Sequence, residues 1–370
     1  MLIPMKEKKI KVGITHGDIN GVGYEVILKA LGDDRILEFC TPIVYGSAKI
    51  AAFYRKSLNI ESLNFNQIAM AADAKPGDYN IINVVPEETK VEPGQSTREA
   101  GEAAFVALER AVADLRNGEI DVLVTAPINK HNIQSETFKF PGHTEYLEAV
   151  AGGDSKSLMI LCNEDVRVAL VTAHLPVAEI PAAINKETVI EKLKIFNDSL
   201  KRDFGFDHPR IAVLSLNPHA GDSGLLGTEE IEVIAPAIEE AQSMKISCFG
   251  PYAADGLFGS GQFKRFDGIL AMYHDQGLAP FKTIAMESGV NFTAGLPFVR
   301  TSPDHGTGYD IAGKGEAVEE SMRQAIYRAI DVYRNRQDYA MIHRNPLRRQ
   351  YFDKSGDNVV LDLTKDDNED

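Results

Sequence analysis

The stretch Gly268-Ile-Leu-Ala-Met-Tyr-His-Asp-Gln-Gly277 carries the pattern that decides the fold. Its apolar part, residues 268–273, is typical of a buried strand. His274 and Asp275 follow that strand directly, and in an open α/β sheet ligands bind just beyond the carboxyl ends of the strands. We therefore interpret this pair as a candidate for chemistry, with Lys282 bringing a positive charge to the same pocket. The alternative is that the pair only caps a turn.

Two other histidines stand at the same kind of position. His174 follows the apolar run 167–172, and His219 follows the run 210–216. Three imidazoles at one edge of a sheet would make a site for a divalent metal ion with open positions for a substrate. Neutral imidazoles favour zinc or a neighbouring transition metal over magnesium. The three histidines form no local motif, so the alternative is that each is an ordinary loop residue.

Apolar runs and helical patterns alternate along the chain, which is typical of an α/β fold. We expect strands at 10–15, 41–46, 121–127, 157–162, 167–172, 210–216, 246–249, 268–273 and 290–300. We expect helices at 26–31, from 48 onward, and at 96–118, 143–150, 185–200, 231–238 and 316–334. The strands 157–162 and 167–172 should pair as a hairpin, and the polar segment that ends at Pro93 should be rich in loops. The helix at 96–118 should begin with a capping box from Ser96 to Glu99.

A glycine-rich loop, residues 16–25, joins the first strand to the first helix and resembles a nucleotide-binding loop. Because a helix N-terminus favours a phosphate or carboxylate, the candidates for cofactor contacts are Gly17, Asp18, Gly21 and Gly23. The third glycine of the dinucleotide fingerprint is missing. A tight turn in which Asp18 and Asn20 bond their own backbone is the alternative.

Two further segments have the composition of ligand loops. His143 and Thr144 stand at a helix start, where first-turn donors suit an anionic ligand. The alternative is that Thr144 only caps that helix. The loop 301–315 is rich in glycine and small donors, so its backbone can lie close to a ligand.

Composition narrows the function classes. The chain has 370 residues and a net charge of −15, which argues against a nucleic-acid or anionic-membrane partner. Cys40, Cys162 and Cys248 have no metal or redox spacing, and we expect three buried thiols in a reducing compartment. No signal peptide or membrane span is expected, so the cytoplasm is the predicted location.

Taken together, these motifs resemble the 4-hydroxythreonine-4-phosphate dehydrogenase family of pyridoxal phosphate biosynthesis. The resemblance runs from about residue 10 to residue 335. It rests on His143-Thr144, Thr172-Ala-His174, Asn217-Pro-His-Ala-Gly221, His274-Asp-Gln-Gly277, Lys282, Asn291, Arg300 and Ser302-Pro-Asp-His-Gly-Thr307. The segment 305–315 also looks like the cofactor loop of the isocitrate and isopropylmalate dehydrogenases, which bind NAD without the usual fingerprint.

This resemblance implies a two-lobed α/β/α fold of the isocitrate/isopropylmalate dehydrogenase type, with the active site in the cleft between the lobes. One lobe, residues 1–130 plus 285–370, would carry the NAD loop. The other, residues 131–284, would carry the metal ligands and the dimer contacts. Two motifs depart from the family pattern. Gly-Asp-Pro-Ala-Gly-Ile-Gly-Pro-Glu is here Gly17-Asp-Ile-Asn-Gly-Val-Gly-Tyr-Glu25, and Pro-Ala-Asp-Thr is here Ala253-Ala-Asp-Gly256.

The resemblance also assigns residues. The metal ligands would be His174, His219 and His274, in a homodimer whose site is shared between subunits, with zinc first and cobalt or magnesium as alternatives. The substrate would be held by His143, Thr144, Lys282, Asn291 and Arg300. NAD or NADP would contact the glycine-rich loop together with His305, Gly306, Thr307 and Asp310.

The expected reaction is oxidation of 4-phosphooxy-L-threonine at C3 to 2-amino-3-oxo-4-phosphooxybutanoate, which loses CO2 to give 3-amino-2-oxopropyl phosphate. The base is Asp275 or Asp255. One alternative is a dehydrogenase for a phosphorylated four-carbon sugar acid, phosphothreonate or phosphoerythronate. A metal-dependent hydrolase or an acyl-phosphate transferase is the alternative from a different class.

Overall fold

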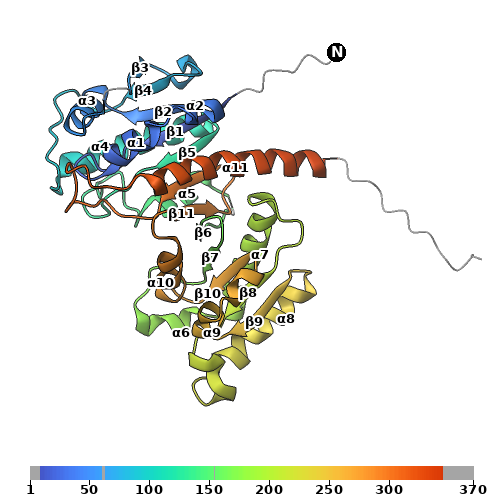
Figure 1. The fold of residues 1–370 in the computed structure, drawn as a ribbon. Helices are drawn as coiled ribbons and strands as arrows, with labels where there is room; N and C mark the ends of the chain where they lie inside the picture. Colours follow the sequence, from blue (N-terminus) through green and yellow to red (C-terminus); the bar gives the residue numbers. More distant parts are fainter. Residues whose placement is uncertain (1–8, 61–62, 154, 345–370) are drawn as a thin grey trace, which may run out of the picture.

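One twelve-stranded mixed sheet runs through the protein in the order β3-β4-β2-β1-β5-β12-β11-β6-β7-β10-β8-β9 (Figure 1). The computed structural model describes residues 9–60, 63–153 and 155–344. The first half of the sheet is entirely parallel. It consists of β1 (Ile10–Thr15), β2 (Cys40–Gly46), β3 (Phe65–Ile68), β4 (Tyr79–Asn83), β5 (Val122–Thr125) and β12 (Arg300–Pro303).

The second half of the sheet is joined to the first by β11 (Val290–Ala294), which is antiparallel to both of its neighbours. Beyond it lie β6 (Leu158–Cys162), β7 (Arg167–Leu170), β10 (Gly268–Ala271), β8 (Ile211–Leu214) and β9 (Cys248–Tyr252). The last four of these run parallel to one another. Ile269 of β10 pairs with Val168 of β7 and with Ala212 of β8, so these three strands end at the same edge.

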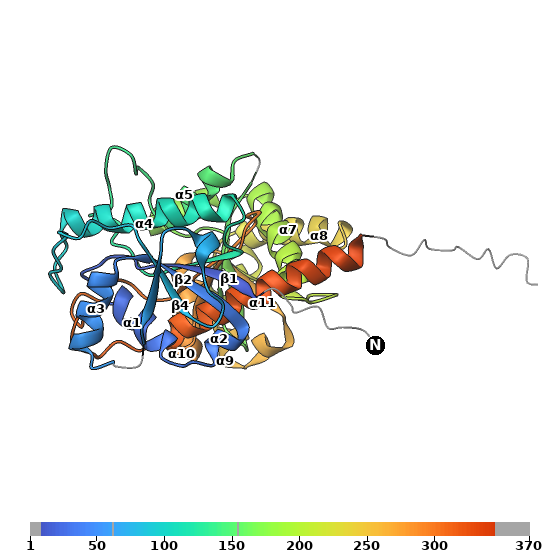
Figure 2. The ribbon, with the colours of Figure 1, turned by 90° about the horizontal axis from the view of Figure 1, so that it is seen from above.

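Helices cover both faces of the sheet. The helices are α1 (Gly23–Leu31), α2 (Ile36–Phe39), α3 (Ala48–Ser57), α4 (Arg98–Arg116), α5 (His143–Ala151), α6 (Ile180–Ala183), α7 (Lys186–Arg202), α8 (Ala235–Ser243), α9 (Ala254–Gly259), α10 (His274–Ala285) and α11 (Glu320–His343). Short 3-10 turns lie at η1 (Ala71–Asp73), η2 (Val177–Glu179), η3 (Pro218–Gly224) and η5 (Gln262–Arg265), and η4 (Glu230–Ile234) is a π-helical turn. Figure 2 shows α4 on one side of β1 and β2, with α1 and α11 on the other.

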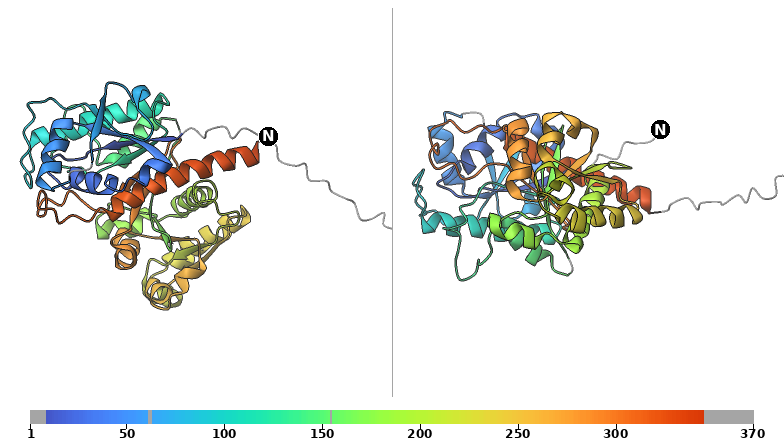
Figure 3. Two further views of the ribbon diagram at one scale, coloured as in Figure 1. Left: turned by 45° about the horizontal axis from the view of Figure 1, so that its top comes forward. Right: turned by 90° about the horizontal axis from the view of Figure 1, so that it is seen from below.

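Helix α11 ties the two halves together (Figures 1 and 3). It packs on β5 and β12 of the first half and reaches α7 of the second. At that far end Arg336 donates a hydrogen bond of 2.7 Å to Oδ1 of the fully buried Asp203. Burial alone would raise the pKa of Asp203, but Arg336 and Arg202 together outweigh it and hold the pKa below its usual value. A paired charge therefore anchors the helix to the second half.

Most expected elements are confirmed, including the hairpin of β6 and β7. The caps differ in one place. Thr97, not Ser96, caps α4, because the Thr97 side chain accepts the hydrogen bond from the Ala100 amide. Asn185 caps α7 through the Thr188 amide, as expected. The alanine stripe of α4 is buried against the first half of the sheet.

Three expectations were wrong in detail. The segment before Pro93 holds two strands, β3 and β4, which the polar side chains of Phe65–Ile68 and Tyr79–Asn83 concealed. The expected strand 290–300 is two strands, because the chain turns at Gly295 (φ +81°), where an added Cβ would lie 2.0 Å from the carbonyl oxygen of Lys156. Helix α11 begins at Glu320 and continues to His343, later at both ends than expected.

Two other expectations concern composition. Cys40, Cys162 and Cys248 are buried free thiols, as expected. Across the described residues, the structure contains no helix with the length and apolar character of a membrane span. The acidic end of the chain, 365–370, lies outside the described residues.

Candidate functional site

Three neighbouring strand ends each lead to one of the expected histidines. The strands β7, β10 and β8 are adjacent and parallel, and they are followed by His174, His274 and His219. The predicted alignment of these strand ends is therefore confirmed. Strand β10 ends at Ala271, two residues earlier than the sequence suggested, and His274 is the first residue of α10. The ring centroid of His274 lies 5.8 Å from that of His174.

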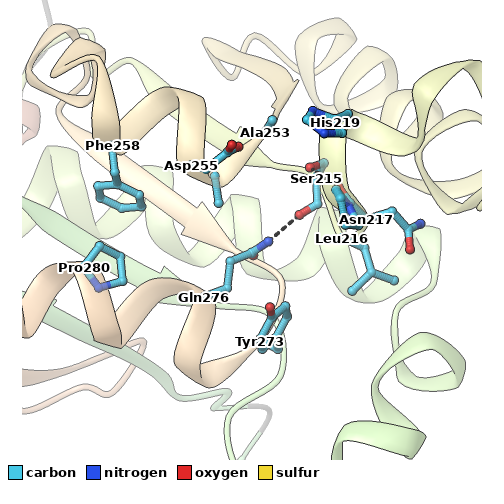
Figure 4. A pocket seen from close by; sticks show the side chains of 12 residues that line it. Ser215, Leu216, Asn217, His219, Ala253, Asp255, Phe258, Tyr273, Gln276 and Pro280 are labelled. Carbon is cyan, nitrogen blue, oxygen red and sulfur yellow. Dashed lines mark hydrogen bonds between the residues drawn. The ribbon is translucent and has the colours of Figure 1, made fainter. Parts of the chain in front are cut away.

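His219 faces a different pocket from the other two histidines. It lines a cavity of ≈ 440 Å³ together with Asp255, Tyr273 and Gln276 (Figure 4). His174 and His274 line a second cavity of ≈ 310 Å³. Within the described part of one chain, no three His, Cys, Asp or Glu side chains are grouped so that they could hold a metal ion. The described part of one chain thus does not bring the three histidines into a single site.

The second cavity, which we call the junction pocket, is lined by residues from both halves of the sheet. They include Thr125 at the end of β5, His174 and His274 of the second half, and Arg300 of β12. Four of the five expected substrate ligands come from different elements, and the pocket brings all five together: His143, Thr144, Lys282, Asn291 and Arg300. The tertiary structure thus collects residues that are dispersed over more than 150 positions of the sequence.

Arg300 is the most informative residue of the junction pocket. Its side chain is buried, and its guanidinium donates hydrogen bonds to the hydroxyl oxygens of Thr125 (2.7 and 3.1 Å) and Thr293 (3.1 Å). Burial lowers the pKa of Arg300 to about 10. Among the residues that the structure describes, no carboxylate lies within ion-pair distance of it. Because a buried cation without a counter-ion is costly, the pocket is suited to an anionic ligand.

Unpaired polar atoms line the same pocket. Nε2 of His143 and Oδ1 of Asn291 are buried, and neither has a hydrogen-bond partner among the described residues. Burial, followed by the charges of Arg300 and Lys130, lowers the pKa of His143 well below its usual value, so its ring is neutral at neutral pH. Gly142 is the N-cap of α5 and no side chain caps the helix, so the alternative role of Thr144 as a cap is wrong. These atoms are available to a bound molecule.

Two other residues of the junction pocket, Lys282 and His274, already contact carboxylates. Nζ of Lys282 lies 3.5 Å from Oδ1 of Asp304, and it donates to the Asp304 carbonyl oxygen at 3.3 Å. Nδ1 of His274 lies 2.7 Å from Oδ1 of Asp275, which leaves Nε2 of His274 for another partner. Of the two candidate bases, Asp275 thus contacts His274, whereas Asp255 lines the same cavity as His219.

The glycine-rich loop is a buried structural turn. Oδ1 of Asp18 accepts a hydrogen bond of 2.9 Å from the Asn20 amide, which confirms the self-bonded turn for Asp18. It is wrong for Asn20, whose side chain accepts from the Glu92 amide and donates to the Gln95 carbonyl oxygen. Oδ2 of Asp18 accepts from Asn132 (2.7 Å) and from Tyr309 (2.8 Å), and the Val22 amide donates to the Thr307 carbonyl oxygen at 2.9 Å. Gly21 also abuts Thr307, where an added Cβ would lie 2.6 Å from the carbonyl oxygen.

The two expected cofactor segments, 17–23 and 305–310, are therefore in direct contact. His305 lines the junction pocket, and its Nε2 is buried without a hydrogen-bond partner in the described structure. Burial lowers the pKa of His305, so this nitrogen belongs to a neutral ring. Gly306 also lines the pocket, whereas Asp310 does not.

Sequence reasoning missed several residues of the site. Thr125, which holds Arg300, ends an apolar strand, and that position was the available signal. Lys130 and Glu145 line the junction pocket, and Tyr309 bonds Asp18. Nothing in the local sequence around these three residues indicates such roles, because their partners are distant in the chain.

Comparisons with known proteins agree with this geometry. A family model described as "Pyridoxal phosphate biosynthetic protein PdxA" matches residues 38–329. A 4-hydroxythreonine-4-phosphate dehydrogenase of Bacteroides thetaiotaomicron is 61% identical over 359 residues, covering 97% of this chain and 98% of the relative. An Oceanobacillus iheyensis protein with the provisional name D-threonate 4-phosphate dehydrogenase is 38% identical, covering 88% of this chain and 98% of the relative. A crystal structure of 4-hydroxythreonine-4-phosphate dehydrogenase from Klebsiella pneumoniae is 32% identical with a TM-score of 0.77, covering 89% of this chain and 99% of the other.

Proposed function

Because the chain belongs to the PdxA family of pyridoxal phosphate biosynthetic proteins, we propose that it is the dehydrogenase that oxidises 4-phosphooxy-L-threonine. The hydroxyl at C3 gives up its proton, and the C3 carbon gives up a hydride that reduces NAD or NADP. The product, 2-amino-3-oxo-4-phosphooxybutanoate, loses CO2 to give 3-amino-2-oxopropyl phosphate. The observation that carries this proposal is Arg300, a buried cation with no carboxylate within ion-pair distance among the described residues, in a pocket with other unpaired polar atoms.

The junction pocket has the donors that a phosphorylated amino acid needs. Arg300 and Lys282 supply positive charge, and a guanidinium can bind a phosphate or carboxylate with two hydrogen bonds. The start of α5, with His143 and Thr144, presents free amides to an anion. Neutral His143 and Asn291 then orient the uncharged groups of the substrate, since both have an unpaired polar atom there.

We assign the metal to His174, His219 and His274, in the order zinc, cobalt, magnesium. The donor set fits, because imidazoles are preferred by zinc and its neighbours. Nδ1 of His274 contacts Asp275, which orients its ring for binding through Nε2. When bound, such a cation lowers the pKa of a coordinated hydroxyl. Asp275 or Asp255 is then the group that accepts the C3 hydroxyl proton.

A homodimer is part of this proposal, because one chain does not bring the three histidines together. Large apolar side chains lie exposed beside the histidine loops: Val177 is 80% exposed, Leu225 is 78% exposed and Ile231 is 55% exposed. Exposed apolar side chains of this kind mark a protein interface. A second copy that covers them would complete the metal site across the interface.

The nicotinamide cofactor is assigned to the contact between the loops 17–23 and 305–310. His305 and Gly306 line the junction pocket, so a nicotinamide bound there would lie next to the substrate. Gly17, Asp18, Gly21 and Gly23 shape the wall behind these residues, and Thr307 and Asp310 continue the loop. The proposal includes the division into a lobe of residues 1–130 plus 285–370 and a lobe of residues 131–284. A cytoplasmic location fits the three free thiols.

Turnover of 4-phosphooxy-L-threonine tests the proposal. The purified protein, supplied with zinc, cobalt or magnesium and with NAD or NADP, should reduce the cofactor and release CO2. His219→Ala should abolish turnover while the circular dichroism spectrum stays unchanged. Full activity of His219→Ala after removal of metal would eliminate the metal role.

The second candidate is D-threonate 4-phosphate, in line with the provisional name of the Oceanobacillus relative. Faster cofactor reduction with that compound would replace the proposed substrate.

A further inference from the structure

Side-chain hydrogen bonds connect the ends of the three strands that lead to the histidines. Thr172 lies two residues before His174, and Met272 lies two residues before His274. The Met272 carbonyl oxygen accepts hydrogen bonds from the Thr172 hydroxyl (2.7 Å) and from the Thr172 amide (3.1 Å). Both partners are buried. The loops of His174 and His274 therefore begin from a fixed spacing.

Gln276 connects the second of these strand ends to the third. Its Oε1 accepts a hydrogen bond of 2.7 Å from the Met272 amide. Its Nε2 donates a hydrogen bond of 2.6 Å to the carbonyl oxygen of Ser215, at the end of β8 (Figure 4). Both ends of the amide are thus used, one toward the turn before His274 and the other toward the loop that carries His219. Gln276 itself lies two residues after His274 on α10.

Glu230 holds the same loop from the opposite side. Its Oε1 accepts hydrogen bonds of 2.7 Å from the amides of Leu216 and Asn217, and its Oε2 accepts one of 3.0 Å from Nδ2 of Asn217. The residue is 3% exposed, and within the described ranges no basic side chain forms an ion pair with it. It is the first residue of the π-helical turn η4, and π turns are frequent at functional sites.

The loop needs such support because its backbone is strained. His219, Ala220, Asp222 and Ser223 have φ between 43° and 59°, in the left-handed region. For residues other than glycine, this conformation costs about 1–2 kcal/mol each and persists only where the surroundings impose it. Gly221 lies directly against Glu230, since an added Cβ would lie 2.6 Å from Oε2 of that residue.

We infer that Gln276 and Glu230 are positioning residues that hold the His219 loop, and through Gln276 the turn before His274, in fixed positions before a cation binds. This inference deepens the proposed function, because it rests on the role of these histidines in binding a cation. Neither side chain needs to touch the cation, the substrate or the cofactor. Each acts through the backbone of a loop that carries a histidine.

The test compares three variants with a matched control. Gln276→Leu removes both hydrogen bonds, and Gln276→Glu keeps the acceptor for Met272 but loses the donor to Ser215. Glu230→Gln keeps an oxygen for the two loop amides but loses the bond from Asn217. Gln242→Leu is the control, because Gln242 also donates to a backbone carbonyl oxygen, that of Cys248 (2.8 Å), in the same half of the sheet but away from the histidine loops.

Two measurements are made on the full-length protein. Hydrogen exchange without metal should show faster exchange of the amides at 215–224 in both Gln276 variants and a smaller change in Glu230→Gln, with wild-type exchange there in Gln242→Leu. Calorimetric titration with Co²⁺ or Zn²⁺ should show affinity lower by about 10- to 100-fold in Gln276→Leu, which is the usual effect of losing a residue that orients a metal ligand. The cation affinity of Gln276→Glu should lie between that of Gln276→Leu and that of the wild type.

The outcomes separate the inference from the proposed function. Wild-type exchange at 215–224 in Gln276→Leu overturns the inference, and so does faster exchange with unchanged cation affinity. If the wild-type protein binds neither cation, the metal role in the proposed function fails. The exchange comparison then decides alone whether Gln276 and Glu230 hold the loops.

Discussion

The hydroxyl of Tyr309 donates a hydrogen bond of 2.8 Å to Oδ2 of Asp18, a residue 291 positions earlier in the chain. Asp18 is buried in the glycine-rich loop, and Tyr309 belongs to the loop that follows β12. Burial and the bond to Asp18 raise the pKa of Tyr309 to about 12, so the phenol stays protonated and continues to donate at physiological pH. This bond holds the two segments of the proposed cofactor site together.

Tyr309→Phe should loosen that contact. A hydrogen bond to a charged group contributes about 1.5–3 kcal/mol, so the free energy of unfolding should fall by an amount in that range. The KM for the nicotinamide cofactor should rise, while the KM for the phosphorylated substrate changes less. Tyr333→Phe is the control, because it also loses a tyrosine-to-aspartate bond, to Asp121 at 3.2 Å, outside the pocket. Equal changes in cofactor KM in both variants would show that Tyr309 has no special role.

Arg300→Met should separate binding from stability. Replacing a buried, uncompensated cation by an apolar side chain is often neutral or stabilising, so the free energy of unfolding should equal or exceed that of the wild type. Binding of the phosphorylated substrate should be lost, as measured by calorimetry. Arg336→Met is the comparison, because it leaves the buried carboxylate of Asp203 with one partner fewer and should cost about 3 kcal/mol. A large loss of stability in Arg300→Met would mean that the arginine serves the fold rather than a ligand.

His16 should make the protein sensitive to mild acid. It is fully buried and stacks on Tyr24 with ring centroids 5.3 Å apart. Burial lowers its pKa from 6.5 to about 4. Between these two values the unfolded chain binds a proton that the folded protein does not, so the stability falls as the pH falls from 6.5 to about 4. The slope from this one group is at most about 1.4 kcal/mol per pH unit.

His16→Leu should remove that contribution. Denaturant unfolding followed across this pH range should give a shallower decline in stability than in the wild type, whatever the variant's absolute stability. His208→Leu, at an exposed position, should leave the decline unchanged. If His16→Leu and the wild type had the same pH dependence of stability, His16 would not be the cause of the loss of stability in mild acid.

Val177→Lys and Leu225→Lys should disrupt the proposed dimer, because each puts a charge into an interface of exposed apolar side chains. Analytical ultracentrifugation should show monomers. The affinity for the cation should fall as the dimer is lost, since the described part of one chain does not gather the three histidines. Met70→Lys replaces a side chain that is 55% exposed in the first half of the sheet, and it should leave the dimer intact. Dimers of unchanged stability in both test variants would place the interface elsewhere.

The sequence by itself determined the α/β class, most of the strands and the motifs that resemble one enzyme family. Apolar runs such as Ile211–Leu214 and Gly268–Ala271 are local signals, because a strand buried on both faces must be apolar throughout. The same runs, each followed by a histidine, indicated a shared edge. The family resemblance named Arg300 and His143 as ligand candidates, and the position of His143 at a helix start indicated the same.

Only the tertiary structure decided how these residues meet. It brought Arg300 to Thr125, with no carboxylate from the described part of the chain within ion-pair distance of the guanidinium. It also placed His219 in a different pocket from His174 and His274. It also showed that Asp18 bonds Tyr309 and that Gln276 bridges two strand ends. The physical reason is that a strand's apolar pattern depends on its own burial. Strand order, pocket walls and hydrogen-bond partners depend on contacts between segments that are far apart in the chain.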